Sequence, residues 1–249
     1  MNDLPDFFQQ DGVKIPFNQE WKKISISLSG GADSALLTFL LCNKISKTKT
    51  GAEIHIISHT RCWKTKPWQQ YDSLNVFNWL RNRFSDIQFI RHTNFIPPDL
   101  EWGDSGATII DEYGKQVSGD IIELRSFAEY IGFYEKIDAY FNAVTRNPKN
   151  VDFKGMHTRD IDPTDNNKHL EIMMHMGIYA CHPFRFIQKD WIINQYFNLN
   201  ILDLLHLTRS CEGTFENLNY RNYRVGQYVP ICGECFWCKE RDWAIEQSK

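Results

Sequence analysis

The first 95 residues alternate between two hydrophobic patterns. Alternating or short apolar runs predict strands over residues 24–28, 53–58 and 87–92. Longer apolar segments predict helices over residues 35–41 and 68–84. Strands that alternate with helices in this way build a mostly parallel sheet with helices on both faces. The pattern therefore predicts a doubly wound α/β fold.

The pattern continues beyond the third strand. Residues 120–136 predict another helix, and residues 137–144 predict a fourth strand before Pro148 stops regular structure. A later helix is predicted to carry Lys189. In the helix over residues 68–84, a spacing of three residues predicts one apolar face, made of Tyr71, Leu74, Phe77 and Leu80.

Two stretches interrupt the alternation. Residues 93–119 contain a Pro-Pro pair and a segment, 107–117, that predicts a hairpin turning near residues 112–115. Such an insertion can serve as a flap over a site. Residues 147–167 are polar and predict a long loop beyond the fourth strand, which is either functional or simply solvated surface.

The composition fits one soluble domain spanning residues 1–249. A chain of 249 residues, 42% of them hydrophobic, can bury about 70–75% of its unfolded surface, so its core needs no disulfides. The net charge of -3 argues against nucleic acid as a partner and favours a small-molecule substrate. We expect a cytoplasmic protein, because no leader-like or membrane-length apolar run is present. A homodimer is compatible with the sequence, which defines no oligomeric state.

The string Ser-Gly-Gly-Ala-Asp-Ser, residues 29–34, lies between the first strand and the first helix. There, free N–H groups and the positive end of the helix dipole favour an anion, and two glycines let it approach the backbone. Ser34 can donate to phosphate, and Asp33 suits a Mg²⁺ ion held between carboxylate and phosphate. The string therefore predicts a phosphate site. The alternative is an ordinary helix start that Asp33 or Ser34 caps.

Other polar residues follow strands in the same way. His59 follows the second predicted strand and Arg146 follows the fourth. Ligands of doubly wound sheets bind outside the carboxyl ends of the strands. We therefore expect both residues to lie at the same edge of the sheet as residues 29–34.

Four of the seven cysteines lie in the C-terminal part of the chain. Cys232, Cys235 and Cys238 form two successive C-x2-C steps, and Cys211 lies upstream. In a chain without a secretion signal, this spacing favours metal binding over disulfides. Four thiolates can close the tetrahedral site that Zn²⁺ prefers, so the set predicts a structural zinc. The alternatives are an iron–sulfur ligand set or a chance grouping. Cys42, in contrast, is predicted to pack inside the first helix.

The string at residues 29–34 resembles the signature loop of the PP-loop enzymes, the N-type ATP pyrophosphatases, which grips the pyrophosphate of ATP. The C-terminal third resembles the tail of one branch of that family, the 7-cyano-7-deazaguanine synthases. This second resemblance covers residues 182–184, 189–193, 207–211 and 232–244. That branch combines the loop with a four-cysteine zinc site that leads into a final helix.

The resemblance implies a HUP-like fold with a C-terminal helical zinc-binding segment, residues 207–249. It implies an ATP-dependent carbon–nitrogen ligase of the queuosine precursor pathway, with ATP, Mg²⁺ and Zn²⁺ as cofactors. Such an enzyme adenylates the carboxylate of 7-carboxy-7-deazaguanine, lets ammonia displace AMP, and activates the resulting amide again to give the nitrile, 7-cyano-7-deazaguanine.

The resemblance also implies site residues. ATP binding is expected from Leu28, Ser29, Gly30, Gly31, Ala32, Asp33, Ser34 and His59. Catalytic roles are expected for Asp33, Ser34 and Lys189, although a lysine on an exposed helix is more commonly solvated. Substrate binding is expected from Arg146, Asp152 and Arg159, since a carboxylate can accept from a guanine-like edge and an arginine can hold a carboxylate.

The chain also departs from this branch. The spacer between Cys211 and Cys232 is long and carries an aromatic and basic string at residues 220–224, and the loop at Asp152 is degenerate. Three hypotheses stay open. They are the deazaguanine nitrile synthase, another PP-loop enzyme (a tRNA sulfurtransferase or a ligase that amidates a different acid), and a zinc module without enzymatic activity.

Overall fold

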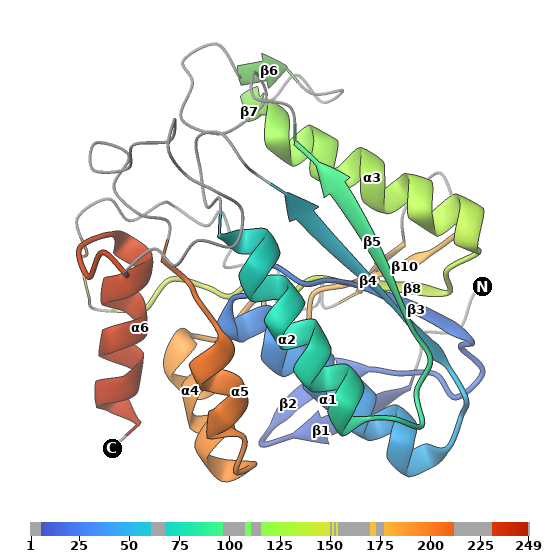
Figure 1. The fold of residues 1–249 in the computed structure, drawn as a ribbon, viewed down its shortest axis with the longest axis horizontal. Coiled ribbons are helices and arrows are strands. Elements are labelled where there is room, and N and C mark those ends of the chain that lie inside the picture. The colour runs from blue at the N-terminus through green and yellow to red at the C-terminus, as the bar shows by residue number, and fades with distance from the viewer. Residues whose placement is uncertain are drawn as a thin grey trace.

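A six-stranded sheet runs through the centre of the computed structural model (Figure 1), in the order β5-β4-β3-β8-β10-β9. The structure describes residues 6–60, 68–96, 108–110, 116–149, 151, 153, 170–172, 177–211 and 231–248. The strands of the sheet are β3 (Lys23–Ser27), β4 (Glu53–Thr60), β5 (Phe89–Phe95), β8 (Ala139–Phe141), β9 (Leu170–Ile172) and β10 (Tyr179–Cys181). Only β9 pairs antiparallel with its neighbour within this sheet.

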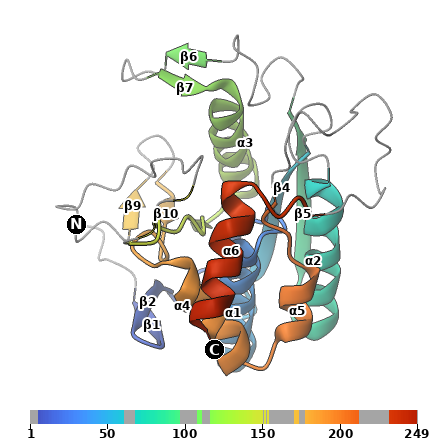
Figure 2. The ribbon, with the colours of Figure 1, turned by 90° about the vertical axis from the view of Figure 1, so that its left-hand side faces the viewer.

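Six helices and two hairpins complete the described part of the chain. The helices are α1 (Ala32–Thr48), α2 (Gln69–Arg83), α3 (Gly119–Glu135), α4 (Lys189–Asn198), α5 (Leu202–Leu207) and α6 (Phe236–Gln247). The hairpins pair β1 (Phe7–Gln10) with β2 (Val13–Pro16), and β6 (Thr108–Ile110) with β7 (Gln116–Ser118). Figure 2 shows α6 in front of α1, with α4 and α5 beside it.

Side chains of the central strands alternate between two cores. Ile26 of β3 and Phe141 of β8 belong to the larger core, to which α1, α2, α4 and α5 contribute. Ile57 of β4 and Tyr140 of β8 belong to a smaller core with Ile131 of α3. Because successive strand residues point to opposite faces, a sheet buried on both sides needs apolar residues in both registers. This two-sided burial confirms the predicted α/β class.

The order of the strands reverses between β3 and β8. Along the chain, β3, β4 and β5 step outward in one direction, whereas β8 and β10 lie on the other side of β3. The connections that leave β3 and β8 therefore diverge and open a crevice at the carboxyl ends of these two strands. The loop at residues 29–34 follows β3 directly, so it lies at this switch point.

One predicted helix face is wrong in part. Phe77 and Leu80 are buried, but Tyr71 and Leu74 are 47% and 36% exposed. A spacing of three falls short of the 3.6 residues in a helical turn, so residues chosen this way rotate away from the core. The buried face of α2 instead continues through Ser73 and Val76.

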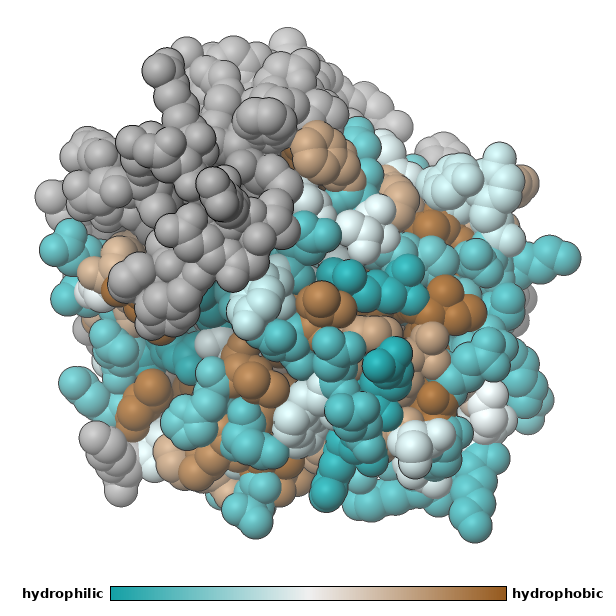
Figure 3. All heavy atoms as spheres, viewed as in Figure 1, coloured by the Kyte–Doolittle hydropathy of each residue, from teal (hydrophilic) through white to brown (hydrophobic). Residues whose placement is uncertain are grey.

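The exterior of the described part is mixed. On the face drawn in Figure 3, teal hydrophilic side chains surround the brown apolar ones over the lower half. Among the described helices, none combines the length and the apolar character needed to cross a membrane. The predicted hairpin in residues 107–117 is confirmed by the pairing of β6 with β7, while most of the polar loop at 147–167 lies outside the described residues.

Candidate functional site

The loop after β3 is held in one shape by a glycine. Gly30 has a φ of +80°, and a Cβ atom there would lie 2.7 Å from the backbone nitrogen of Ser73 in α2. Its carbonyl accepts a hydrogen bond of 2.8 Å from the backbone N–H of Arg209. Both the backbone angle and the close approach of α2 therefore require glycine at this position.

Helix α1 begins without a side-chain cap. Its N-cap is Gly31, which has no side chain, so the helix start lacks a side-chain cap hydrogen bond. The hydroxyl of Ser34 accepts from the backbone N–H of Ser29 at 3.2 Å and donates to the carbonyl of Gly31 at 3.2 Å. The alternative in which Asp33 or Ser34 caps the helix is therefore wrong. A helix start left without a cap is suited to bind an anion through its N–H groups.

A cavity of about 270 Å³ opens at the switch point. Strands, loops and helices far apart in the sequence contribute to its wall. The lining residues include Ser27, Leu28, Ser29, Gly31, Asp33, Ser34, His59, Gln69, Asn142, Thr145, Lys189, Arg209, Ser210 and Trp237. Its volume is near the lower end of small-molecule sites, which begin at roughly 300 Å³. The structure thus brings most of the predicted loop residues, His59 and Lys189 together around one cavity.

Two of the predicted loop residues lie outside the lining of the cavity. Gly30 and Ala32 are not among the described lining residues. Ala32 is fully buried, and its carbonyl accepts a 2.6 Å hydrogen bond from the hydroxyl of Tyr196. Burial raises the pKa of Tyr196 well above its ordinary value, so this phenol stays neutral and acts as the donor.

Lys189 is buried rather than solvated. Its side chain is 2% exposed, and its ammonium pairs with the Oδ2 atom of Asp33. A second carboxylate, Glu240 of α6, is 0% exposed and lies 3.8 Å from the same ammonium. The position of Lys189 at the start of α4 therefore places a cation beside the loop, as the predicted role requires. Sequence alone missed Glu240, because nothing in the chain near residue 240 reveals its burial.

Two buried oxygen atoms at the cavity have no hydrogen-bond partner in the described part of the chain. They are Oδ1 of Asp33 and Oε1 of Gln69, whose residue is only 6% exposed. A buried polar atom without a partner costs about 1–3 kcal/mol, so such atoms mark places where a ligand can bind. The carboxylate oxygen suits a divalent cation, and the amide oxygen suits a donor such as an amine. No sequence signal pointed to Gln69.

A network of polar side chains lies at the ends of β3 and β8, beside the cavity. The hydroxyl of Tyr140 and that of Ser27 lie 2.7 Å apart, and Asn142, one residue beyond β8, also lines the cavity. Burial raises the pKa of Tyr140, against the opposing effect of hydrogen bonds from Ser27 and Asn142. This neutral network at the ends of β3 and β8 offers the cavity both donors and acceptors.

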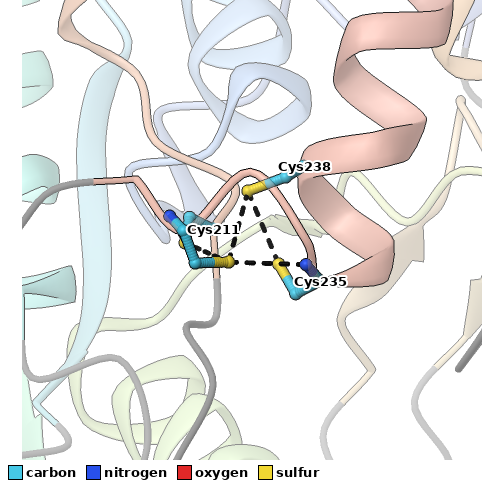
Figure 4. A group of neighbouring side chains, drawn as sticks. Cys211, Cys235 and Cys238 are labelled. Atoms are coloured by element: carbon cyan, nitrogen blue, oxygen red, sulfur yellow. Dashed lines mark hydrogen bonds between the residues drawn. The ribbon is translucent and has the colours of Figure 1, made fainter. Parts of the chain in front are cut away.

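The four predicted cysteines converge at the start of α6. Figure 4 shows the sulfur atoms of Cys211, Cys235 and Cys238 turned toward one another. The Sγ atoms of Cys211 and Cys232 lie 3.5 Å apart, those of Cys232 and Cys238 3.8 Å, and those of Cys235 and Cys238 3.5 Å. All four ligand atoms lie within 4.8 Å of one another. This group could hold a metal ion.

The spacing of the sulfur atoms fits a single ion. Zinc–sulfur bonds of about 2.3 Å in a tetrahedron place the ligand sulfurs about 3.8 Å apart. A 4Fe–4S cluster spreads its ligands further, because each of the four thiolates binds a different iron. Backbone N–H groups of Cys232 and Cys235 also point at the sulfur atoms of Cys211 and Cys232, each at 3.4 Å. Donors of this kind stabilise the thiolate form that binds metal.

The cysteine group is joined directly to the cavity. The indole N–H of Trp68 donates to the carbonyl of Cys211 at 3.0 Å, and the guanidinium of Arg209 lies 4.1 Å above the ring of Trp68. Arg241 of α6 donates to the carbonyls of Thr208 and Leu205. Because Arg209 also donates to Gly30, the segment before Cys211 connects the cysteine group with the loop at residues 29–34.

The predicted substrate residues are less well placed. Arg146 is half-buried and is not among the described residues that line the cavity, although Thr145 is. Asp152, Arg159 and the string at residues 220–224 lie outside the described residues. The roles of Arg146, Asp152 and Arg159 therefore stay predictions. Cys42 is fully buried in α1, and burial raises the pKa of its thiol far above the ordinary value, as expected of a packing residue.

Fold and site together define an α/β protein with an uncapped helix start at its switch point and an adjoining group of four cysteines. No protein-family model matches the sequence, and no curated protein matches it either. Among solved structures, the U34-tRNA thiolase NcsA from Methanococcus maripaludis, determined with its 4Fe–4S cluster, is similar with a TM-score of 0.43 and 14% identity. The match covers 80% of this chain and 61% of the thiolase, so this chain spans less than two thirds of that protein.

The phosphoadenylyl-sulfate reductase from Candida auris, solved as a phosphate complex, is similar with a TM-score of 0.41 and 12% identity. This match covers 78% of this chain and 82% of the reductase. Likeness at this level is too distant to assign a reaction or a ligand to this chain. The chemistry of the site itself therefore carries the proposal below.

Proposed function

We propose that this chain is an ATP-dependent enzyme of the PP-loop type that activates a carboxylate and exchanges its oxygen for nitrogen. The observation that carries the proposal is the grouping at the switch point of an uncapped helix start, an unpartnered oxygen of Asp33, and a buried lysine. A magnesium–nucleotide complex needs three contacts from a protein. They are N–H donors for its phosphates, an oxygen ligand for its divalent cation, and a positively charged side chain beside the phosphates.

The proposed roles follow from the geometry. The first turn of α1 holds the pyrophosphate of ATP, Asp33 holds Mg²⁺, and Lys189 neutralises phosphate charge. AMP transfer turns a carboxylate oxygen into a good leaving group, and the cavity positions the reactants and excludes water. Gln69 and Asn142 supply polar contacts to a base, in addition to the predicted residues Arg146, Asp152 and Arg159. The cysteines hold a structural Zn²⁺, for which their compact spacing is the support.

The proposed substrate is 7-carboxy-7-deazaguanine, with ammonia as the nitrogen donor and 7-cyano-7-deazaguanine as the product. The four-cysteine set after the loop, with its C-x2-C steps at the start of α6, favours this reaction. The direct test incubates the protein with this acid, ATP, Mg²⁺ and ammonium, and follows the nitrile by mass spectrometry. Absence of the nitrile, with no more AMP released than in a control without the acid, removes the substrate assignment and leaves an amidating ligase on another acid.

The loop assignment has its own test. We expect Asp33→Ala to abolish AMP release, by at least about a hundredfold, because the cation loses its protein ligand. Asp242→Ala, at an exposed position on α6, serves as the control and retains the wild-type rate. Equal rates for the two variants contradict the role of Asp33.

The metal separates the proposal from a sulfurtransferase. We expect one zinc per chain by elemental analysis and a colourless protein. Iron and a brown colour instead favour a tRNA sulfurtransferase that uses an iron–sulfur cluster. A protein that binds zinc but releases no AMP from ATP is the result expected of a non-enzymatic zinc module.

A further inference from the structure

Three charged side chains are buried together between the phosphate loop and the metal centre. Lys189 and Glu240 are 2% and 0% exposed, and Asp33 is 20% exposed. The group contains two carboxylates and one ammonium, and the guanidinium of Arg241 on α6 lies close enough to interact electrostatically with Asp33. Buried charges are costly unless opposite charges or metal ions balance them.

The three side chains come from three helices. Asp33 lies in the first turn of α1, Lys189 is the first residue of α4, and Glu240 lies in the second turn of α6. Cys235 is the N-cap of α6, and Cys238 lies in the first turn of this helix. Because α6 packs against α4, the cysteine centre determines where Glu240 meets Lys189.

A cation at Asp33 competes with Lys189. The ammonium pairs with Oδ2 of Asp33, while Oδ1 has no partner in the described residues. A divalent ion on this carboxylate repels the ammonium, since like charges within a few ångströms destabilise each other strongly in a buried site. The carboxylate of Glu240, 3.8 Å from the ammonium, offers Lys189 a second buried anion.

We propose that Glu240 is a positioning residue that holds Lys189 beside the phosphate site when Asp33 binds Mg²⁺, and that the cysteine centre sets its place. This inference rests on the proposed function, which supplies the cation and the nucleotide. It assigns Glu240 no contact with ATP. Glu240 instead affects how strongly Lys189 competes with Mg²⁺ for the carboxylate of Asp33.

The test measures how ATP binding depends on Mg²⁺ in Glu240→Gln. Without the second carboxylate, Lys189 depends on Asp33 alone and competes more strongly with the metal. We expect the Mg²⁺ midpoint for ATP binding, measured by calorimetry, to rise roughly tenfold. Glu246→Gln, which removes the same charge from an exposed position on the same helix, keeps the wild-type midpoint. Elemental analysis is expected to find wild-type zinc in both variants.

A double variant tests whether Glu240 acts through Lys189. In a Lys189→Met background no ammonium competes for Asp33, so Glu240→Gln is expected to change the Mg²⁺ midpoint by less than about twofold. An equal rise with and without Lys189 overturns the proposal. If Glu240→Gln does not fold, Glu240→Asp replaces it. This variant keeps the negative charge but withdraws it from Lys189 by one methylene, so we expect an intermediate Mg²⁺ midpoint.

The outcomes separate this inference from the proposed function. A wild-type protein that binds no ATP at any Mg²⁺ concentration overturns both. A wild-type protein that binds ATP, with an unchanged midpoint in Glu240→Gln, overturns the role of Glu240 alone. Loss of zinc from Glu240→Gln also overturns it, because the residue then supports the metal centre rather than the lysine.

Discussion

Gly30 shows how a single position can satisfy two separate demands. Its backbone adopts a left-handed angle, and α2 approaches so closely that a side chain would meet the backbone at Ser73. Gly51 has a similar angle, φ +69°, but nothing lies within 4 Å of the place where its Cβ would be. Comparing the two positions separates the cost of the angle from the cost of the contact.

We expect Gly51→Ala to lower the free energy of unfolding by about 1 kcal/mol, the usual cost of a left-handed alanine. Gly30→Ala is expected to lower it by about 1–3 kcal/mol more, because α2 must also move. Urea denaturation of both variants measures the difference. Equal losses show that the contact with α2 relaxes without cost.

Gln69 gives the second prediction at this scale. Its buried amide oxygen has no partner in the described residues, so Gln69→Met removes a polar group that contributes nothing to folding. We expect the melting temperature to stay the same or rise, and ATP binding to weaken about fivefold if a nucleotide donor satisfies this oxygen. The half-buried neighbour Gln70, changed to methionine, controls for the loss of an amide. A fall in melting temperature with intact binding indicates a structural role.

Some site residues were predictable and others were not, for a physical reason. The loop and the cysteines have chemistry that depends on spacing within the chain, so sequence reveals them. Gln69 and Glu240 gain their importance from burial, which helices distant in the sequence provide. Lys189 lies between these cases, because its residue type suggested a role while its burial did not show in the sequence.

Among the elements, β4 and β5 share a stacked pair of histidines, of which His55 is buried and His92 is half-buried. The rings of His55 and His92 stack with centroids 5.2 Å apart, and Nδ1 of His55 lies 3.0 Å from Nε2 of His92. Burial lowers the pKa of both, with Glu53 opposing the effect at His55 and Glu135 opposing it at both. Lys23 also faces His55 and lowers its pKa further.

This pair predicts how stability depends on pH. Because both pKa values are lowered, the folded state binds fewer protons than the unfolded chain, whose histidines titrate near pH 6.5. The stability that this pair contributes is therefore complete above about pH 6.5 and falls as the pH drops below it. Unfolding by urea at several pH values between 5 and 8 measures this slope. His92→Gln is expected to flatten it, and His206→Gln, at an exposed position on α5, is expected to leave it unchanged. A slope that survives His92→Gln means that other groups cause it.

Most long elements were predictable, whereas several short ones were not. The sequence indicated α2, α3 and the strands β3, β4 and β5 to within a few residues. It also indicated α1, but that helix continues to Thr48, well beyond the apolar run at residues 35–41. The three-residue strands β9 and β10 show no period, and α5 has only six residues. The hairpin of β1 and β2 did leave a signal, since Asp11 and Gly12 have φ angles of 46° and 79°, as Asp-Gly turns do.

At the scale of the whole molecule, the group of four cysteines and the loop at residues 29–34 form one connected unit. The segment before Cys211 bonds to Gly30, and α6 contacts α4 and holds the end of α5 through Arg241. The single domain over residues 1–249 and the homodimer stay predictions. The switch-point site was predictable from the fold class, whereas this connection was not, because it depends on tertiary contacts of a segment without periodicity.

Removing the metal should therefore loosen more than the cysteines. After treatment with a chelator, we expect the amides of α6 and Arg209 to exchange with deuterium at least about tenfold faster, while those of β3 and β4 stay protected. Hydrogen exchange with mass spectrometry checks this, with α3 as an internal reference on the other face of the sheet. Full protection of α6 without metal shows that packing alone holds it.

The hydrogen bond between Arg209 and Gly30 also has a consequence for how the protein is made. The loop leaves the ribosome early, together with β3 and α1, but the residue that fixes its carbonyl is synthesised only after the whole sheet. A nascent chain that has not yet reached Arg209 can form the first strands without completing the loop. Completion of this loop is therefore a late event in the folding of each molecule, because it requires the segment that carries Arg209.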